Sequence, residues 1–481
     1  MSVKKLQPYN TDAYFDEMFT SQGEVKSHYR LLHRTIDSFE SAELQLKHEQ
    51  AQASFLRQGI TFTVYKDNAG TERTMPFDFI PIIISSEEWQ EIERGIKQRL
   101  KALNAFLDDI YSEQKILHDE VIPKNLVYDN PYYLKELKET SFPLGNHLFL
   151  SGIDLIRDEH GEYRVLEDNL RNPSGLSYMF QNRYVMRQVY PEFFKQHALY
   201  TLEEQMDDMR KALMEYSTNG SASTAVLLTP GVFNSAYYDH VFLAQQMGIQ
   251  LVESPDLVVK DDHVFMRTIY GLKQVDVIYR RIDDEYLDPA HFRPDSLLGV
   301  EGLYRSFSQG NVAIVNALGN GVADDKAMYA YVPDMIQYYL NEEPILRNVD
   351  TYSLRKPEHR DWVLERLDEL VVKNVGASGG YDMLIGPHST TEKINKFREK
   401  IISEPHQYIA QPTIKLSRAP AFQGNEFYPC HVDLRVYAMS GKDIQVIPGG
   451  LSRVALKKGS LVVNSSQGGG GKDTWVLKEE V

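Results

Sequence analysis

The chain has 481 residues and a mass of 55.3 kDa, enough for two or three domains with substantial cores. Its net charge of −16 argues against nucleic acid or an anionic membrane as the main partner. The single cysteine, Cys430, excludes a disulfide framework and a multi-cysteine metal site. No signal peptide and no apolar run of about 20 residues is found, so we expect a cytoplasmic protein.

The first half of the chain begins with a polar, helix-rich segment up to about residue 50. Residues 59–84 then predict a hairpin that turns at Asp67–Gly70, followed by an extended apolar run. Ser85 and Glu88 have the spacing of a capping box and predict the start of a long helix. Apolar residues recur every three or four positions along it and predict one buried stripe: Trp89, Ile92, Ile96, Leu100, Leu103, Leu107 and Ile110.

The second half alternates strands and helices before it becomes strand-rich. Residues 224–253 predict a βαβ unit and hence a parallel sheet, and 275–281 and 311–317 predict further buried strands. From residue 371 onward, strands are separated by glycine-rich turns. We therefore predict an α/β or α+β protein of several layers.

The stretch from residue 153 to residue 169 predicts a second hairpin, centred on His160–Gly161. This register places Asp154 directly opposite Glu167, and strand alternation puts Asn169 on the same face and Asp168 on the other. Two facing carboxylates at about 5 Å repel each other by about 3 kcal/mol. Either Mg²⁺ binds these oxygens, or the hairpin is exposed and water screens the charges.

Other polar residues follow buried strands in patterns that suit a phosphate site. Lys373 ends an apolar strand before Gly376, Ser378, Gly379 and Gly380, a loop that either folds over phosphates or is a simple glycine-rich hairpin. His431, Asp433 and Arg435 share one strand face, which is either a site wall or a solvated edge. Lys326 opens a predicted helix, where a cation is unfavourable unless an anion lies nearby.

Two stretches resemble functional motifs without matching them. Residues 465–473, SSQGGGGKD, have Ser466 and Asp473 at the positions where a P-loop needs glycine and a hydroxyl residue. We expect these glycines to form a loop that closes over a site. Cys430 is a lone strand cysteine with no activating neighbour beyond His431, so we expect it to be inert.

Taken together, these stretches resemble the circularly permuted ATP-grasp proteins (type 2) related to glutathionylspermidine synthetase. The resemblance covers residues 14–477 and is carried by LEDNLRNPSG, LTPGVFNSAYYDH, DVIYRRIDD, VVKNVGASGGYDML, HVDLR and LVVNSSQGGGGKDTWVL, among others. The acidic hairpin precedes the lysine and glycine-loop strands, which is the permuted order. The resemblance implies a helical N-terminal region (1–140), a metal hairpin (141–220), a Rossmann-like βαβ pre-ATP-grasp unit (221–318) and a lysine and glycine-loop part (319–481).

The resemblance also implies cofactors and roles for individual residues. ATP and two Mg²⁺ ions are the expected cofactors. The metal ligands would be Asp154, Glu167 and Asn169. The ATP-binding residues would be Lys326, Lys373, Gly376, Ser378, Gly379, Gly380 and, beside the adenine, Gln411. Arg435 and Arg453 would stabilise the transferred phosphoryl group. The acceptor side would involve Arg171, Ser174, Asn234 and Tyr237.

These roles indicate a ligase that joins a carboxylate to an amine through an acyl phosphate and releases ADP and phosphate. A phosphotransferase and a non-catalytic ATP-binding scaffold are the alternatives. Members of the family usually have a basic residue where this chain has Cys430, so the acid and the amine stay open. An α-helical protein and a transglutaminase-like protein are the expected companions.

Overall fold

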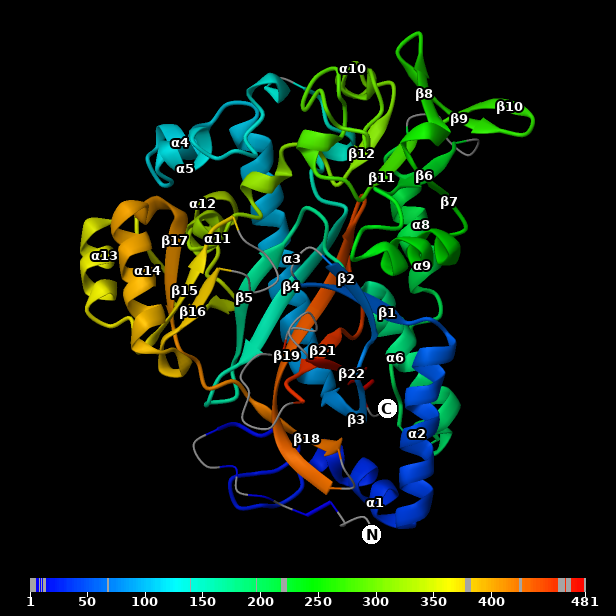
Figure 1. The fold of residues 1–481 in the computed structure, drawn as a ribbon, viewed down its shortest axis with the longest axis vertical. Coiled ribbons are helices and arrows are strands. Elements are labelled where there is room, and N and C mark those ends of the chain that lie inside the picture. Colours follow the sequence, from blue (N-terminus) through cyan, green and yellow to red (C-terminus); the bar gives the residue numbers. More distant parts are fainter. Residues whose placement is uncertain are drawn as a thin grey trace.

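The computed structural model describes residues 6–7, 9, 11, 14–66, 69–138, 140–195, 197–217, 223–376, 382–423, 426–456, 463 and 469–479. It contains helices and several sheets, so the predicted mixed α/β class is confirmed. Figure 1 shows a long sheet in the middle of the molecule, helices on both sides of it, and smaller lobes above and to the left. The four segment boundaries predicted from the sequence stay predictions.

The central sheet draws its strands from distant parts of the chain. Among the described residues it has nine strands, in the order β13–β5–β4–β19–β21–β22–β3, with β18 and β20 also paired to β19. Their bounds are β3 Phe77–Ile84, β4 Leu150–Arg157, β5 Tyr163–Asn169, β13 Arg347–Asn348, β18 Arg418–Gln423, β19 Glu426–Ser440, β20 Ile444–Val446, β21 Leu451–Val454 and β22 Gly470–Val476. The pairing of β3 with β22 joins an early and a late segment of the chain in this sheet.

Helix α3 (Ser86–Ile110) covers part of this sheet, and the capping box at its start is confirmed. The Ser85 side chain accepts from the Glu88 backbone N–H, and the Glu88 carboxylate accepts from the Ser85 backbone N–H. Every residue of the predicted apolar stripe is buried, from Trp89 to Ile110. The stripe faces the main core, which α12 (Val332–Leu340) also joins.

A second sheet is wholly parallel, as the βαβ pattern predicted. Its order is β12–β11–β6–β7. The bounds are β6 Ala225–Leu228, β7 Gln250–Val252, β11 Val277–Arg280 and β12 Ala313–Val315, and α9 (Tyr237–Met247) connects β6 to β7. A small antiparallel sheet projects beyond it, made of β8 Leu257–Lys260, β9 His263–Thr268 and β10 Gly271–Gln274.

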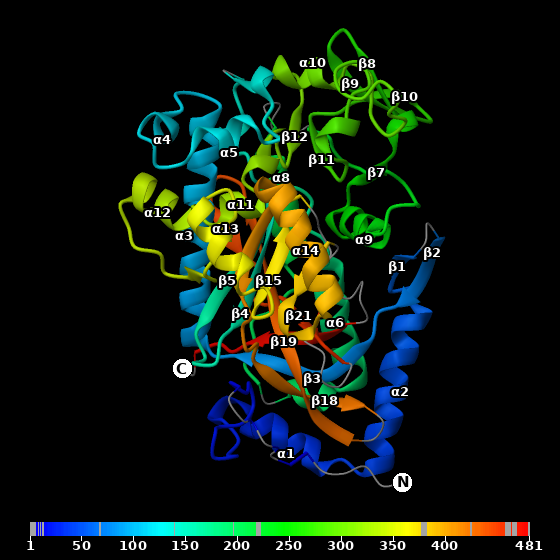
Figure 2. The same ribbon diagram turned by 60° about the vertical axis from the view of Figure 1, so that its left-hand side comes forward.

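A third sheet is antiparallel and has a core of its own. Its order is β14–β17–β15–β16, with bounds β14 Tyr352–Ser353, β15 Leu370–Asn374, β16 Met383–Ile385 and β17 Tyr408–Pro412. Helices α13 (Pro357–Leu364) and α14 (Thr391–Ser403) lie on its outer side (Figure 2). Residues of both helices and three of the strands form a separate apolar cluster. This lobe faces β5 and α11 of the main body.

The remaining elements surround these sheets. The predicted first hairpin is confirmed as β1 (Thr61–Lys66) paired with β2 (Ala69–Thr74). The other helices are α1 Arg30–Ser38, α2 Ser41–Arg57, α4 Lys115–His118, α5 Lys124–Tyr128, α6 Leu176–Val189, α7 Pro191–Phe194, α8 Gln205–Met214, α10 Leu303–Ser308 and α11 Lys326–Tyr329.

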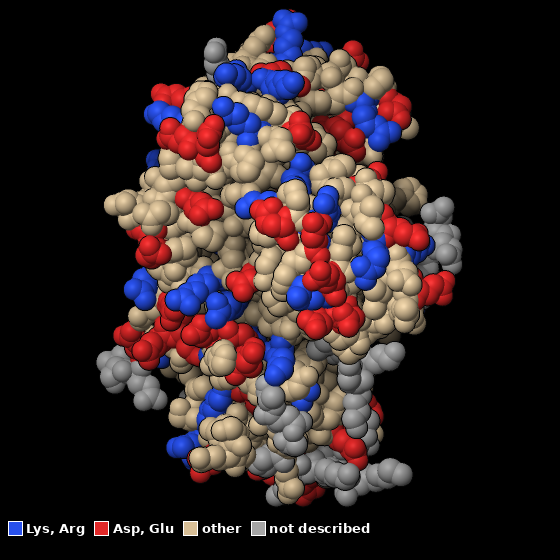
Figure 3. Space-filling view, turned by 90° about the vertical axis from the view of Figure 1, so that its left-hand side faces the viewer, with Lys and Arg blue, Asp and Glu red and all other residues tan. Residues whose placement is uncertain are grey.

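Charged side chains of both signs are mixed on the surface. On the face in Figure 3, Lys and Arg lie among Asp and Glu instead of forming one broad basic patch. Within the described part of the chain, no helix combines the length and apolar character needed to cross a membrane.

Candidate active site

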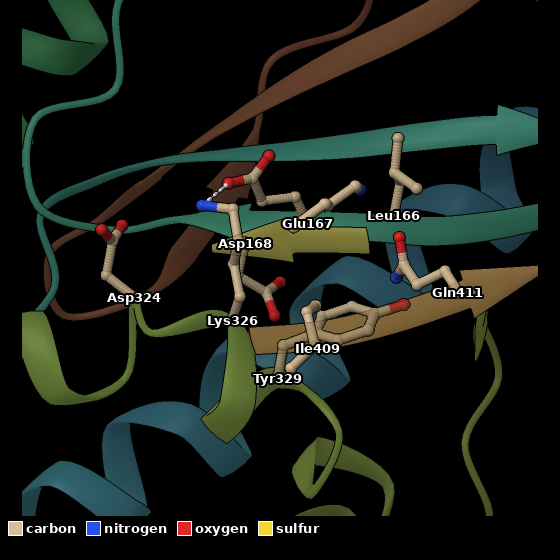
Figure 4. Close-up of a pocket in the computed structure, with 9 residues that line it drawn as sticks. Leu166, Glu167, Asp168, Asp324, Lys326, Tyr329, Ile409 and Gln411 are labelled. Carbon is tan, nitrogen blue, oxygen red and sulfur yellow. Dashed lines mark ion pairs between the residues drawn. The ribbon is translucent and has the colours of Figure 1, made fainter. Parts of the chain in front are cut away.

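A narrow pocket lies where the third sheet faces β5. Its wall combines residues from β5, from α11 and the residues before it, and from β15 and β17 (Figure 4). The lining residues are Leu166, Glu167, Asp168, Asp324, Lys326, Tyr329, Lys373, Ile409 and Gln411. Three of the residues predicted to contact ATP, Lys326, Lys373 and Gln411, therefore meet in one pocket.

The hairpin of β4 and β5 has the predicted register at its charged residues. Asp154 lies opposite Glu167, and Asn169 lies opposite Gly152. The register slips by one residue on the turn side of this pair, which the sequence pattern did not reveal. Asp168 points away from Glu167, as alternation requires, and forms a buried ion pair with Arg99.

Two arginines neutralise Asp154. Arg435 binds both of its carboxylate oxygens, with Nε–Oδ1 2.5 Å and Nη2–Oδ2 2.9 Å. Arg453 adds a contact of 2.9 Å to Oδ2 and also binds Asp433 with both donors, at 2.8 and 2.6 Å. Burial opposes ionisation of Asp154, but the two guanidinium groups outweigh it and lower its pKa to about 2.

Glu167 has a cationic partner as well. Lys326 Nζ lies 2.8 Å from Glu167 Oε1 (Figure 4). Asp325 caps α11 by accepting from the Ala327 backbone N–H, which fixes Lys326 as the first helical residue. Burial would lower the pKa of Lys326, but Glu167 outweighs that effect and raises it. The repulsion between Asp154 and Glu167 is thus offset by cations of the chain, an arrangement the sequence did not suggest.

Lys373 completes the positive side of the pocket. It lies on β15 opposite Ile409, so its side chain projects from the third sheet toward the β4–β5 hairpin. Burial lowers its pKa, and the nearby Lys326 lowers it further, whereas Glu167 and Asp154 oppose that change. On β17, Gln411 is buried and its Nε2 donates to Thr351 Oγ1 at 2.9 Å.

The strand face of Asp433 and Arg435 is a buried wall and not a solvated edge. Asp433 is buried, and both side chains converge on Arg453 or Asp154. His431 is buried on the same strand, with its Nδ1 2.9 Å from the Leu416 carbonyl oxygen. The tertiary structure excludes a solvated edge because β19 is paired with β4 along one edge and with β21 along the other.

The glycine loop is only partly within the described residues. The Gly376 backbone N–H donates to Asn374 Oδ1 at 3.0 Å and is exposed. Ser378, Gly379 and Gly380 lie outside the described residues, so their lid role stays a prediction.

The residues expected on the acceptor side are divided between two places. The Arg171 Nε donates to Asp324 at 2.8 Å, and the Ser174 carbonyl oxygen accepts from Arg435 and Tyr437. Asn234 Oδ1 instead accepts from the Ala236 backbone N–H, and Tyr237 begins α9. Within the described residues, the pocket wall includes none of these four residues, and it does not include Asp154, Asn169, Arg435 or Arg453 either.

Sequence reasoning missed Asp324 and Tyr329. Asp324 accepts from the Leu170 backbone N–H at 2.6 Å and so holds the turn that follows β5. The Tyr329 hydroxyl donates to the Val165 carbonyl oxygen, which ties α11 to the same strand. Asp324 stands two residues before Lys326, and this proximity in the sequence could have identified it as a site residue.

The two motif-like stretches have structural roles where they are described. Lys472 is buried in β22 and contacts Asp78 and the carbonyl oxygens of Ile80 and Pro420. Gly470 and Gly471 are strand residues, so the expected loop is wrong at these two positions. Burial raises the pKa of Cys430 to about 12, which agrees with an inert thiol.

Comparison with known proteins identifies the family. The model of the circularly permuted ATP-grasp type 2 family matches residues 81–455. An uncharacterized protein of Synechocystis sp. is 48% identical over 98% of this chain and 99% of its own length. An uncharacterized protein of Mycobacterium tuberculosis is 47% identical over 98% of this chain and 86% of its own length.

Two further proteins are similar at lower sequence identity. A Frankia casuarinae protein with the provisional name glutamate–cysteine ligase 2-2 is 40% identical over 99% of this chain, which spans 55% of that protein. The fold resembles that of a glutathione synthetase-like effector from Globodera pallida in its apo form. The TM-score is 0.59 at 12% identity, covering 92% of this chain and 98% of the effector.

The chain therefore belongs to the circularly permuted ATP-grasp type 2 family, and the predicted family is confirmed. Membership of this family supports an ATP-dependent ligase in general. The narrower link to glutathionylspermidine synthetase stays a prediction.

Proposed function

We propose that this protein joins a carboxylate to an amine, using ATP bound in the pocket between β5 and the third sheet. The observation that carries the proposal is the convergence of cations from four separate elements on one hairpin. Lys326 comes from α11, Lys373 from β15, Arg435 from β19 and Arg453 from β21. ATP is the ligand expected for this family, and its negatively charged triphosphate would be bound by several cations of this kind.

Lys373 and Lys326 suit the phosphates, and Gln411 suits the base. Both ammonium groups line the pocket, and no carboxylate of the described residues pairs with Lys373. A charge-assisted contact with a phosphate oxygen is worth about 1.5–3 kcal/mol. Gln411 lies on the same wall beside Ile409, at the apolar part of the pocket.

The donor set near the phosphates fits Mg²⁺ by its chemistry. Asp154, Glu167 and Asn169 offer carboxylate and amide oxygens on one face of the hairpin, and hard oxygen ligands are what this ion prefers. The Asn169 Nδ2 is buried without a hydrogen-bond partner among the described residues. When bound, Mg²⁺ neutralises charge on the phosphates; we propose two ions.

An acyl phosphate explains how a carboxylate becomes reactive. A carboxylate oxygen of the acid attacks the γ-phosphorus, the bond between that phosphorus and the β,γ-bridging oxygen breaks, and ADP leaves. The amine then attacks the acyl carbon, phosphate leaves with the bonding electron pair, and the amine loses a proton. Arg435 and Arg453, which both bind Asp154, are the residues proposed to hold the charge of the transferred group.

The acid and amine substrates are not assigned, and the name of one relative suggests which pair to test first. The provisional name of the Frankia casuarinae protein supports testing glutamate as the acid and cysteine as the amine first. Other amino acids, peptides and polyamines belong in the same screen. Ser174, whose carbonyl oxygen accepts from Arg435, is a proposed acceptor-side residue in contact with one of the two arginines.

ADP release across such a screen tests the proposal. For an active pair, the acid is labelled with ¹⁸O in its carboxylate, and one label is expected in the released phosphate. Hydroxylamine is expected to trap a hydroxamate. A stable phosphorylated product without an amide would favour a phosphotransferase, and AMP formation would contradict the acyl phosphate. The matched variants are Glu167→Gln in the site and Glu162→Gln, which changes an exposed residue of the same hairpin.

A further inference from the structure

The acidic residues that suit a metal ion are already bound to cations of the chain. Arg435 and Arg453 occupy both carboxylate oxygens of Asp154. Lys326 lies 2.8 Å from Glu167 Oε1. Among the described residues, no group of three or more His, Cys, Asp or Glu side chains is arranged to hold a metal ion. In this arrangement the hairpin offers no free carboxylate pair to a divalent cation.

The charges that meet at the hairpin sum to a positive value. The cations are Lys326, Lys373, Arg435 and Arg453, and the carboxylates are Asp154, Glu167 and Asp433. The two other carboxylates of the pocket wall, Asp168 and Asp324, form ion pairs with Arg99 and Arg171, and each pair is neutral. One positive charge is therefore in excess, on a pocket whose Lys373 has no carboxylate partner among the described residues. Coulomb attraction in such a partly buried pocket favours a polyphosphate and opposes an isolated Mg²⁺.

We infer that the free site binds the nucleotide polyphosphate first and accepts Mg²⁺ only afterwards, because Lys326 and Arg435 must exchange their carboxylates for phosphate oxygens. This inference rests on the proposed ATP site and concerns how that site is loaded. Charge-assisted bonds to phosphate replace the bonds that the two side chains lose. The exchange leaves Glu167 and one side of Asp154 free to act as ligands together with Asn169.

A divalent cation without nucleotide offers Lys326 and Arg435 no phosphate oxygens in exchange for their carboxylates. To reach Asp154 or Glu167, a divalent cation would have to displace a guanidinium or an ammonium group and leave it without an anion. The displaced group would stay within a few ångströms of the ion, and like charges at that distance repel strongly. By linkage, the factor by which nucleotide raises metal affinity equals the factor by which metal raises nucleotide affinity.

Three binding measurements on the full chain test the order. Mn²⁺ alone, followed by its electron paramagnetic resonance signal, is expected to stay unbound at millimolar concentration. ATP in the presence of EDTA is expected to bind in calorimetry. A non-hydrolysable ATP analogue with Mg²⁺ is expected to bind at least as tightly. Saturable binding of Mn²⁺ to the free protein at micromolar concentration would overturn the inference and leave the proposed ligase intact. Failure of ATP to bind with or without metal would overturn both.

Variants that lack two of the cations are expected to reverse this binding pattern. Lys326→Met combined with Arg435→Met is expected to weaken ATP binding by about tenfold or more and to create Mn²⁺ binding without nucleotide. Lys396→Met, on the exposed side of α14, is expected to change neither. Circular dichroism and thermal melting check that each variant is folded. A folded double variant that loses ATP affinity without gaining any for Mn²⁺ would show that the cations do not shield the carboxylates and would refute the inference.

Discussion

Asp168 lies on the face of β5 opposite to Glu167, where it forms a buried ion pair with Arg99. Arg99 Nε lies 2.7 Å from Asp168 Oδ1, and Arg99 Nη2 lies 2.6 Å from Asp168 Oδ2. Both side chains are 1% exposed. Asp168→Ala would leave the guanidinium buried with Asn348 Oδ1, at 2.7 Å, as its remaining hydrogen-bonding acceptor among the described residues. Removing one partner of such a pair costs about 3–5 kcal/mol.

Urea denaturation followed by tryptophan fluorescence measures this loss. Trp89 lies on α3, the helix that carries Arg99, and Trp475 lies on β22 of the central sheet. We expect Asp168→Ala to lower the free energy of unfolding by about 3–5 kcal/mol at an unchanged slope. Glu162→Ala, on the exposed part of the same hairpin, is the control and should change it by less than about 0.5 kcal/mol.

A double substitution separates the ion pair from simple loss of packing. Arg99→Met with Asp168→Leu removes both charges and keeps apolar volume, so much of the lost stability should return. If Asp168→Ala unfolds at the same urea concentration as the wild-type protein, the buried pair is not stabilising and the reasoning fails. The same conclusion would follow if the double variant were less stable than the single one.

The other predictions concern the pocket itself. Lys373→Met should weaken ATP binding by about 1.5–3 kcal/mol in calorimetry, and Lys396→Met should not; equal affinities would move the nucleotide site elsewhere. Glu167→Gln should abolish ADP release in the presence of an active acid and amine, while an unchanged rate would exclude Glu167 from the site. Asp154 has a lowered pKa of about 2, so its ionised form contributes stability above about pH 4 that is lost as the pH falls toward 2. Asp154→Asn should therefore flatten the acid-unfolding curve between those pH values, and a parallel curve would contradict the pairing.

Much of the fold followed from local patterns in the chain. The α3 stripe, its capping box and the β4–β5 turn depend on residues close together in sequence, and all three are confirmed. The βαβ unit was predictable for the same reason, because a strand, a helix and a strand in that order imply parallel pairing. The one-residue slip in the hairpin had no such signal, since irregular pairing leaves no mark in the alternation of polar and apolar residues.

By itself, the sequence determined which residues carry charge at strand ends and helix starts, and the order of its motifs indicated the ATP-grasp family. Only the tertiary structure decided what those charges contact. Arg435 and Arg453 stand about 280 and 300 positions from Asp154 in the chain, yet strand pairing through β19 and β21 brings them onto its two oxygens. Asp168 and Arg99 meet in the same way across 69 positions. Local patterns follow from the backbone geometry of neighbours, whereas these ion pairs depend on which distant strands and helices pack together, and that is settled by the burial of the whole core.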